Sequence, residues 1–222
     1  MRRYLFPAAA IIGLFLAGCA GTTQPVTESP TAADTTVRTG PISPDTHFAA
    51  GQLAESQNKL PAAIDQYQQA IKLNPQHRGA LYRLAVIYAE LKQYPVSIDT
   101  WKRYIQATHE AATAYGDLGF CQELAGQSDA AAASYKTGIA KDASNVPCRV
   151  NYGLMLARGG NIQAAVQIWQ PVLAPAEIHY NLGSIYANEG RKEEARYEYQ
   201  RALQLDPKLT EARTRVAALD QN

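Results

Sequence analysis

Histidine and cysteine are the residues of this 222-residue chain whose spacing would most readily reveal a reactive site. They lie far apart in the sequence, at His47, His77, His109 and His179 and at Cys19, Cys121 and Cys148. None falls in an HExxH, a CxxCH or a Cys/His pattern with the spacing that zinc or haem ligation requires. The sequence therefore predicts no metal centre, and we expect no other cofactor.

Motifs for nucleophilic catalysis and phosphate binding are also missing from the sequence. A catalytic serine commonly lies on a strained strand-to-helix turn with the pattern GxSxG, and the chain contains no such pattern. The pair Gly159 and Gly160 lies where other segments of the chain also turn, so it indicates a turn between helices rather than a phosphate cradle. We therefore predict a protein without catalytic activity.

Three series of positions recur along the chain at a spacing close to 34 residues. The first series is aromatic and consists of Tyr67, Trp101, Tyr135, Trp169 and Tyr199. The second is small and consists of Gly51, Ala85, Gly119, Gly153 and Gly183. The third consists of Ala63, Ser97, Ala131, Ala165 and Ala195. Three series that stay in phase indicate stacked structural repeats.

Each repeat contains two stretches in which apolar residues recur three and four positions apart, as on one face of a helix. Residues that tolerate a left-handed backbone separate these stretches at Asn58, Gly126, Gly160 and Gly190. In the second repeat, Ser97, Tyr104 and His109 depart from the pattern, so we expect looser or locally adjusted packing there. In the fourth, Pro171 and Pro175 should end the second helix early, because proline cannot continue a helix.

This pattern resembles that of tetratricopeptide repeats (TPRs), which carry an aromatic residue, Leu-Gly and Tyr on the first helix, then Ala, an aromatic residue, Ala and Pro. The fifth unit carries it most fully, at Tyr180, Leu182, Gly183, Tyr186, Ala195, Tyr199, Ala202 and Pro207. The resemblance implies an all-α fold, a right-handed α-solenoid of about five helical hairpins with a C-terminal capping helix. The expected repeats are 44–77, 78–111, 112–145, 146–175 and 176–209, and the expected capping helix is 210–220.

In this family the first helices of the repeats line a concave surface that binds partners, so their outward positions are candidate binding residues. These are Phe48, Gln52, Tyr82, Arg83, Val86, Asp117, Phe120, Val150, Asn151, Leu154, Tyr180, Asn181 and Ser184. Apolar and aromatic residues predominate, which favours a groove for a partner protein or peptide. Filling of this surface by the chain's own N-terminal segment or by neighbouring side chains is the alternative. Relatives that bind acidic chaperone tails need Lys, Asn and Arg at set positions, and Arg83 is the only basic residue here, so that partner is not expected.

The N-terminal residues resemble a bacterial lipoprotein signal. Two arginines precede an apolar run that is too short to span a membrane, and Leu-Ala-Gly-Cys ending at Cys19 resembles the lipobox. The resemblance implies that residues 1–18 are a removed signal peptide and that Cys19 carries acyl chains such as palmitate. Ala20 favours the outer membrane, with the protein facing the periplasm. An ordinary secretory signal and an uncleaved anchor are the alternatives. Residues 19–43, rich in Thr and Pro, are expected to form a disordered tether.

Composition and charge exclude a nucleic-acid partner. The chain is 46% hydrophobic with a formal net charge of +1, and removal of the signal would leave about −1. Nucleic-acid-binding proteins usually carry a basic stripe, and this sequence shows no such clustering.

The two remaining cysteines, Cys121 and Cys148, would lie in a compartment that permits disulfides. In the repeat register they are offset along successive first helices by roughly 10 Å of helical rise, which exceeds the separation a disulfide tolerates. We expect two buried thiols, with a bridge as the alternative.

The layout of signal, tether and repeats predicts a membrane-anchored, non-catalytic scaffold that binds an envelope protein or peptide. It is similar to pilotin-like lipoproteins of type IV and tight-adherence pilus systems, which assist secretin assembly. The same layout also occurs in scaffolds for peptidoglycan enzymes. An envelope hydrolase with a site built from scattered Asp, Glu and His residues is the competing hypothesis. The partner's identity and the oligomeric state stay open.

Overall fold

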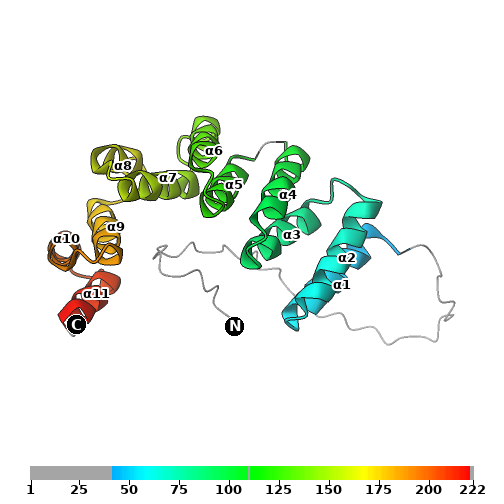
Figure 1. The fold of residues 1–222 in the computed structure, drawn as a ribbon, viewed down its shortest axis with the longest axis horizontal. Coiled ribbons are helices and arrows are strands. Elements are labelled where there is room, and N and C mark those ends of the chain that lie inside the picture. Colours follow the sequence, from blue (N-terminus) through cyan, green and yellow to red (C-terminus); the bar gives the residue numbers. More distant parts are fainter. Residues whose placement is uncertain (1–41, 110, 221–222) are drawn as a thin grey trace, which may run out of the picture. The chain divides into compact units, whose positions relative to one another are not determined.

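The computed structural model describes residues 42–109 and 111–220, which form eleven α-helices and no strand (Figure 1). In chain order the helices are α1 (Pro44–Ser56), α2 (Leu60–Leu73), α3 (Arg78–Glu90), α4 (Tyr94–Ala107), α5 (Ala112–Leu124), α6 (Ser128–Lys141), α7 (Val146–Arg158), α8 (Ile162–Trp169), α9 (Pro175–Asn188), α10 (Lys192–Leu205) and α11 (Thr210–Asp220). The signal peptide, Cys19 and all of the expected tether except its last two residues lie outside the described residues. Within the described part of the chain, no helix combines the length and apolar character that crossing a membrane requires.

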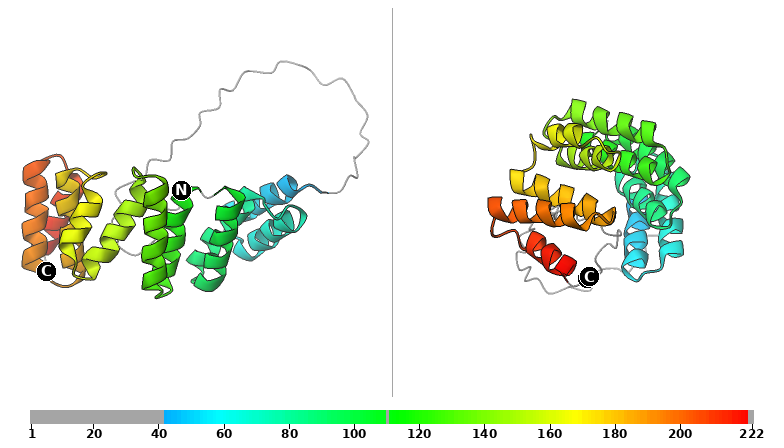
Figure 2. Two further views of the ribbon diagram at one scale, coloured as in Figure 1. Left: turned by 90° about the horizontal axis from the view of Figure 1, so that it is seen from above. Right: turned by 60° about the vertical axis from the view of Figure 1, so that its left-hand side comes forward.

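The helices pack as consecutive antiparallel hairpins. The first ten helices pair as α1 with α2, α3 with α4, α5 with α6, α7 with α8 and α9 with α10, and α11 packs on α10. Each hairpin also contacts the next one in the chain, and the left view of Figure 2 shows the hairpins following one another in chain order. The predicted all-α solenoid of about five hairpins with a terminal helix is therefore confirmed.

The turn inside each hairpin contains one residue with a left-handed backbone. The four predicted positions adopt positive φ angles, at Asn58 (59°), Gly126 (74°), Gly160 (82°) and Gly190 (76°). In the second hairpin Lys92 takes this conformation (59°), and His109 does so (53°) between α4 and α5. A left-handed backbone disfavours residues with a Cβ, so residue type did not reveal these two positions.

The fourth hairpin is interrupted where the sequence predicted. Helix α8 ends at Trp169 after eight residues, whereas α2, α4, α6 and α10 each have fourteen. Pro171 lacks the N–H that would continue the helix, and Pro175 begins α9. Helix α9 packs against α7 as well as against α10, just as α7 packs against α5 in the preceding pair of hairpins.

The aromatic and small series of the repeats meet in the core. All five aromatic residues of the series are at most 2% exposed, and in four of the five hairpins a glycine on the first helix lies directly under the ring. A Cβ added to Gly153 would lie 2.1 Å from Nε1 of Trp169. This contact explains why the two series recur in phase, since neither position changes size without the other.

Candidate functional site

An open pocket of about 330 Å³ lies between α1, α3 and α4. Its lining residues are Phe48 from α1, Arg78, Gly79, Tyr82 and Arg83 from α3, and Tyr104 from α4. Three aromatic rings and a glycine make the walls largely apolar, while the only charged groups among these lining residues are two guanidinium groups. Such a surface suits a ligand in which an apolar group lies next to a polar group.

One wall of the pocket is Phe48, whose position depends on a glycine. The Phe48 ring centroid lies 5.7 Å from that of Tyr67 and 5.0 Å from that of His77. A Cβ on Gly79 would lie only 2.7 Å from Cζ of Phe48. Any larger residue at position 79 would therefore displace this ring.

The opposite wall is an aromatic cluster formed by α3 and α4. The Tyr82 ring lies 5.4 Å from Trp101 in an edge-to-face arrangement and 5.6 Å from Tyr104, and Trp101 lies 5.6 Å from Tyr104. Tyr104 thus fills space beside Trp101, while the Ser97 hydroxyl donates a buried hydrogen bond of 2.7 Å to the carbonyl of Ala85. The expected departure in the second repeat is a local adjustment of packing.

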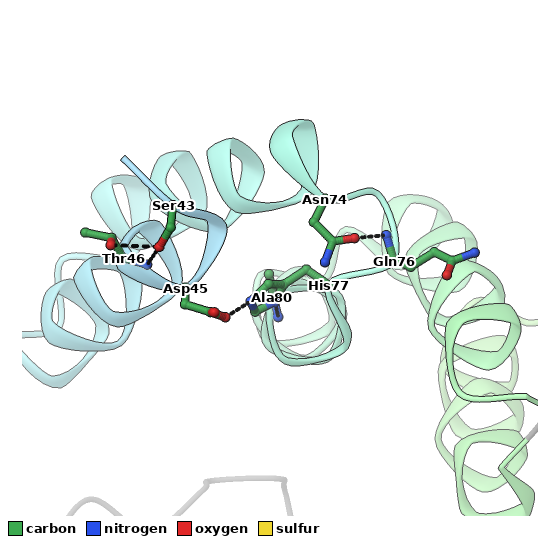
Figure 3. Close-up of polar contacts among 7 residues, drawn as sticks. All are labelled: Ser43, Asp45, Thr46, Asn74, Gln76, His77 and Ala80. Atoms are coloured by element: carbon green, nitrogen blue, oxygen red, sulfur yellow. Dashed lines mark hydrogen bonds and ion pairs between the residues drawn. The ribbon is translucent and has the colours of Figure 1, made fainter. Parts of the chain in front are cut away.

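His77 connects the starts of α1 and α3 beside this pocket (Figure 3). Its Nδ1 accepts a hydrogen bond from the backbone N–H of Ala80 at 3.1 Å, which caps α3. The proton must then be on Nε2, which donates to Oδ1 of Asp45 at 3.0 Å. Because the same ring packs against Phe48 in a tilted arrangement, His77 holds one wall of the pocket in place.

Arg83 lines the pocket, but its charge is already balanced. Its Nε donates to Oε2 of Glu55 at 3.0 Å, and a terminal nitrogen pairs with the other carboxylate oxygen. The hydroxyl of Tyr67 donates to the same carboxylate at 2.7 Å. Both charged side chains are only about a fifth exposed, at 21% and 20%. The predicted binding residue Arg83 is therefore engaged in linking α1 to α3.

The same arrangement recurs in the third and fourth hairpins. The carboxylate of Glu123 accepts from the Tyr135 hydroxyl at 3.2 Å and pairs with Arg158 of α7. A glutamate that joins its own hairpin's tyrosine to the next hairpin's arginine is thus a link between repeats, which supports a structural role for Arg83.

Arg78 is the other charged residue of the pocket. Its Nε donates to the carbonyl of Ala107, near the end of α4, at 2.9 Å. No carboxylate among residues 42–109 and 111–220 forms an ion pair with it. Arg78 and Gly79 are not among the residues predicted from the sequence, and Tyr104 was expected only as a departure from the repeat pattern. The available signal for Gly79 was a glycine near a helix start that forms no turn.

Asp117 of α5 is exposed, yet the protein atoms around it disfavour its charged form. Desolvation raises the pKa of this carboxyl from 3.8 to about 7. Burial also raises the pKa of Tyr104, with Asp117 raising it further and Arg78 lowering it. Water also reaches the exposed Asp117 side chain and screens part of this effect.

The raised pKa of Asp117 predicts a pH-dependent gain in stability for Asp117→Asn. Between pH 4 and about 7 the folded protein binds more protons than the unfolded chain, so wild-type stability falls as pH rises and then levels off. Asparagine does not titrate, so the advantage of the variant should be smallest at pH 4 and largest above pH 7. Urea unfolding at pH 4, 5.5 and 8 would measure it, with Asp99→Asn on α4 as the control for loss of an exposed carboxylate. A constant difference at all three pH values would contradict the prediction.

The other predicted groove residues are not all available. Gln52 is exposed, and Phe120, Val150, Asn151 and Ser184 are half-buried. Val86 and Leu154 pack against hydrophobic clusters of the core. Tyr180 and Asn181 are only 2% and 4% exposed, and the Tyr180 ring lies 5.6 Å from that of Tyr199. The placement of Tyr180 and Asn181 on a free surface is therefore wrong, because the packing of α9 on both α7 and α10 buries them.

Histidines and cysteines outside the pocket have structural surroundings. His47 forms a 2.8 Å hydrogen bond to Gln66, and His179 forms one of 2.6 Å to Glu198, each joining the two helices of a hairpin. Cys121 and Cys148 are buried free thiols, as predicted. Burial raises the pKa of both, that of Cys148 to about 12, which makes them poor nucleophiles at neutral pH. Within the described residues, no group of three His, Cys, Asp or Glu side chains is arranged to hold a metal ion.

Comparison with known proteins agrees with the repeat architecture. Two models described as tetratricopeptide repeat match this chain, at residues 48–114 and 176–209. The human tetratricopeptide repeat protein 7B is 26% identical over 105 residues, which is 47% of this chain and 12% of that protein. The chain therefore spans only a small part of that relative.

Solved structures share the fold at low sequence identity. MamA has a TM-score of 0.61 and 19% identity, covering 76% of this chain and 94% of its own. TTC0263 from Thermus thermophilus has a TM-score of 0.57 and 23% identity, covering 81% and 100%. YrrB, described as a TPR protein with an unusual peptide-binding site, has a TM-score of 0.55 and 22% identity, covering 75% and 88%. These likenesses concern the fold alone. The family models therefore identify tetratricopeptide repeats at residues 48–114 and 176–209, and the described helices form an α-solenoid of the kind found in these tetratricopeptide-repeat structures.

Proposed function

We propose that this protein is a membrane-anchored, non-catalytic scaffold that binds a partner protein or peptide through the first helices of its repeats. The pocket between α1, α3 and α4 is the observation that carries the proposal, because it presents three aromatic rings at an open surface. Exposed apolar surface of this kind commonly marks a contact site for a polypeptide. The repeat fold suits that role, since stacked hairpins place their first helices side by side.

The proposed membrane anchoring rests on the Leu-Ala-Gly-Cys motif that ends at Cys19, which lies outside the described residues. Acyl chains on this cysteine would hold the protein on a membrane, because each buried methylene contributes about 0.8 kcal/mol and several chains hold firmly. We place the repeats on the periplasmic side of the outer membrane. There the scaffold would assist assembly of a pilus, a secretin or another envelope complex, or position peptidoglycan enzymes.

The buried surroundings of the cysteines support a role without catalysis. Their raised pKa values keep both thiols protonated at neutral pH. His47 and His179 each join the two helices of their own hairpin through a hydrogen bond. The partner-binding surface is thus the feature of the described residues that best accounts for a function.

Site-specific photocrosslinking in the source cells would test both parts of this proposal. Gln52 is exposed on α1 and lies one helical turn after Phe48, so a photoreactive residue there should crosslink to the partner. Tyr197 on α10 is 60% exposed and serves as the control position. We expect a defined adduct from position 52 in the membrane fraction, and Cys19→Ser should move the protein to the soluble fraction. If position 52 gives no more adduct than position 197, the proposed partner binding is contradicted. If Cys19→Ser fractionates like the wild type, the proposed membrane anchoring is contradicted.

A further inference from the structure

Helices α3 and α4, which form most of the pocket, lie in a segment with an excess of positive charge. Residues 78–107, which include the turn between these helices, contain five basic and two acidic residues. The two acids, Glu90 and Asp99, do not line the pocket, whereas Arg78 and Arg83 do. Charge complementarity therefore favours an anionic partner at this end of the repeat array.

The two arginines are not equivalent toward such a partner. Arg83 is already paired with Glu55. Arg78 uses its Nε on the carbonyl of Ala107, and no described carboxylate pairs with its guanidinium. A guanidinium has five N–H donors, so the end formed by the two terminal nitrogens retains the paired donors that match a carboxylate. Arg78 is thus the group of the pocket that is suited to bind one.

The apolar part of the pocket limits the size of what lies beside that carboxylate. A volume of about 330 Å³ is at the lower end of the range for ligand sites, roughly 300–1,000 Å³. It suits one large side chain with its backbone better than a cofactor. The floor at Gly79 has no side chain, and the rings of Phe48 and Tyr82 provide apolar contact on either side.

We propose that this pocket binds an acidic peptide segment of the partner, with a large apolar side chain against Phe48, Gly79 and Tyr82 and an adjacent side-chain carboxylate on Arg78. This inference rests on the proposed function and specifies the chemistry of the partner. Asp117, which acts on Tyr104 from α5, would repel a carboxylate. The partner's carboxylate therefore belongs on Arg78 and not beside Asp117.

Selection of peptides on the full chain in detergent would test the proposal. The probe is a library of random heptapeptides with blocked ends, so that any carboxylate belongs to a side chain. We expect enrichment of peptides with Asp or Glu next to a large apolar residue. Replacing that acid by its amide should weaken binding about tenfold or more in calorimetry, because a charge-assisted contact is lost. Added salt should weaken the acidic peptides more than the amide forms.

Variants of the chain assign the effect to Arg78. With Arg78→Gln the acidic peptide and its amide should bind equally, while Arg78→Lys should keep part of the preference because the charge remains. Lys102→Gln, which removes an exposed charge of α4 outside the pocket, should leave the preference intact. Melting temperatures of all variants would show that each is folded.

The outcomes separate this inference from the proposed function. Two results would overturn the inference but not the proposed function. In one, the enriched peptides depend on Tyr82 but contain no acidic residue. In the other, Arg78→Gln still prefers the acidic peptide over its amide form as strongly as the wild type does. Peptides that bind equally well to Tyr82→Ala would overturn the use of this pocket and with it the proposed function at this site. Binding that appears only after deletion of residues 20–40 would identify the chain's own N-terminal segment as the occupant and overturn the inference.

Discussion

Replacement of Trp169 by alanine is expected to lower the free energy of unfolding by about 3–5 kcal/mol, a large part of the roughly 5–15 kcal/mol that stabilises a typical domain. Trp169 is fully buried and is the last residue of α8, which is the shortest of the second helices of the five hairpins. It belongs to the cluster that joins α7, α8 and α9, and its Nε1 donates to the carbonyl of Val150 at 3.1 Å. Its loss would leave a cavity and remove the side-chain hydrogen bond that joins α8 to α7. Urea unfolding followed by circular dichroism would measure the change.

Two control variants show whether the effect comes from the buried ring. Trp169→Phe keeps an aromatic ring and should lose less stability than alanine, although it removes the bond to Val150. Tyr197→Ala removes a 60% exposed aromatic ring from α10 and should change stability by no more than about 0.5 kcal/mol. Equal effects of Trp169→Ala and Tyr197→Ala would contradict the assignment of Trp169 to the joint between repeats four and five.

Replacement of Tyr82 by alanine is expected to reduce partner binding strongly while leaving the fold intact. Tyr82 is 38% exposed, and its ring contacts include those with Trp101 and Tyr104. An aromatic contact of this kind contributes about 0.5–1.5 kcal/mol, which shifts the melting temperature by only a few degrees. An aromatic residue at a binding hot spot contributes about 2 kcal/mol or more, or roughly thirtyfold in affinity.

Calorimetry with a selected peptide and thermal unfolding of the same samples would separate these two effects. Tyr197→Ala is the matched control, because it removes the same side chain from an exposed position outside the pocket. Collapse of the fold in Tyr82→Ala would show that the ring is a core residue. Unchanged binding with an intact fold would show that the partner does not use this pocket.

The arrangement of helices follows from features that are local in the sequence. The aromatic series that includes Tyr67 and Trp169 recurs in phase with small residues because ring and glycine meet within one hairpin. The left-handed positions at Asn58 and Gly126 and the break at Pro171 also follow from single-residue backbone preferences. The repeat pattern and its resemblance to tetratricopeptide repeats were therefore enough to predict the all-α solenoid, its turns and its interruption.

The availability of individual side chains was less predictable. Helix register placed Tyr180 and Asn181 on the same face as Tyr82, but their burial depends on neighbours from other hairpins. Arg83 was expected to be the basic group of the binding groove, yet it is paired with Glu55, which lies 28 residues earlier on another helix. Register gives the direction of a side chain along its own helix and does not give its depth or its partner.

Residue spacing alone was sufficient for the repeats, their two-helix form, the buried aromatic series and the interruption before Pro175, because each depends on positions within about one repeat. Packing between hairpins was needed to show that Phe48, Gly79, Tyr82 and Tyr104 enclose one pocket and that Arg78 is its unpaired cation among the described residues. This difference arises because the pocket is assembled by three helices. Its volume and charge depend on distances between side chains that no pattern within a single helix encodes.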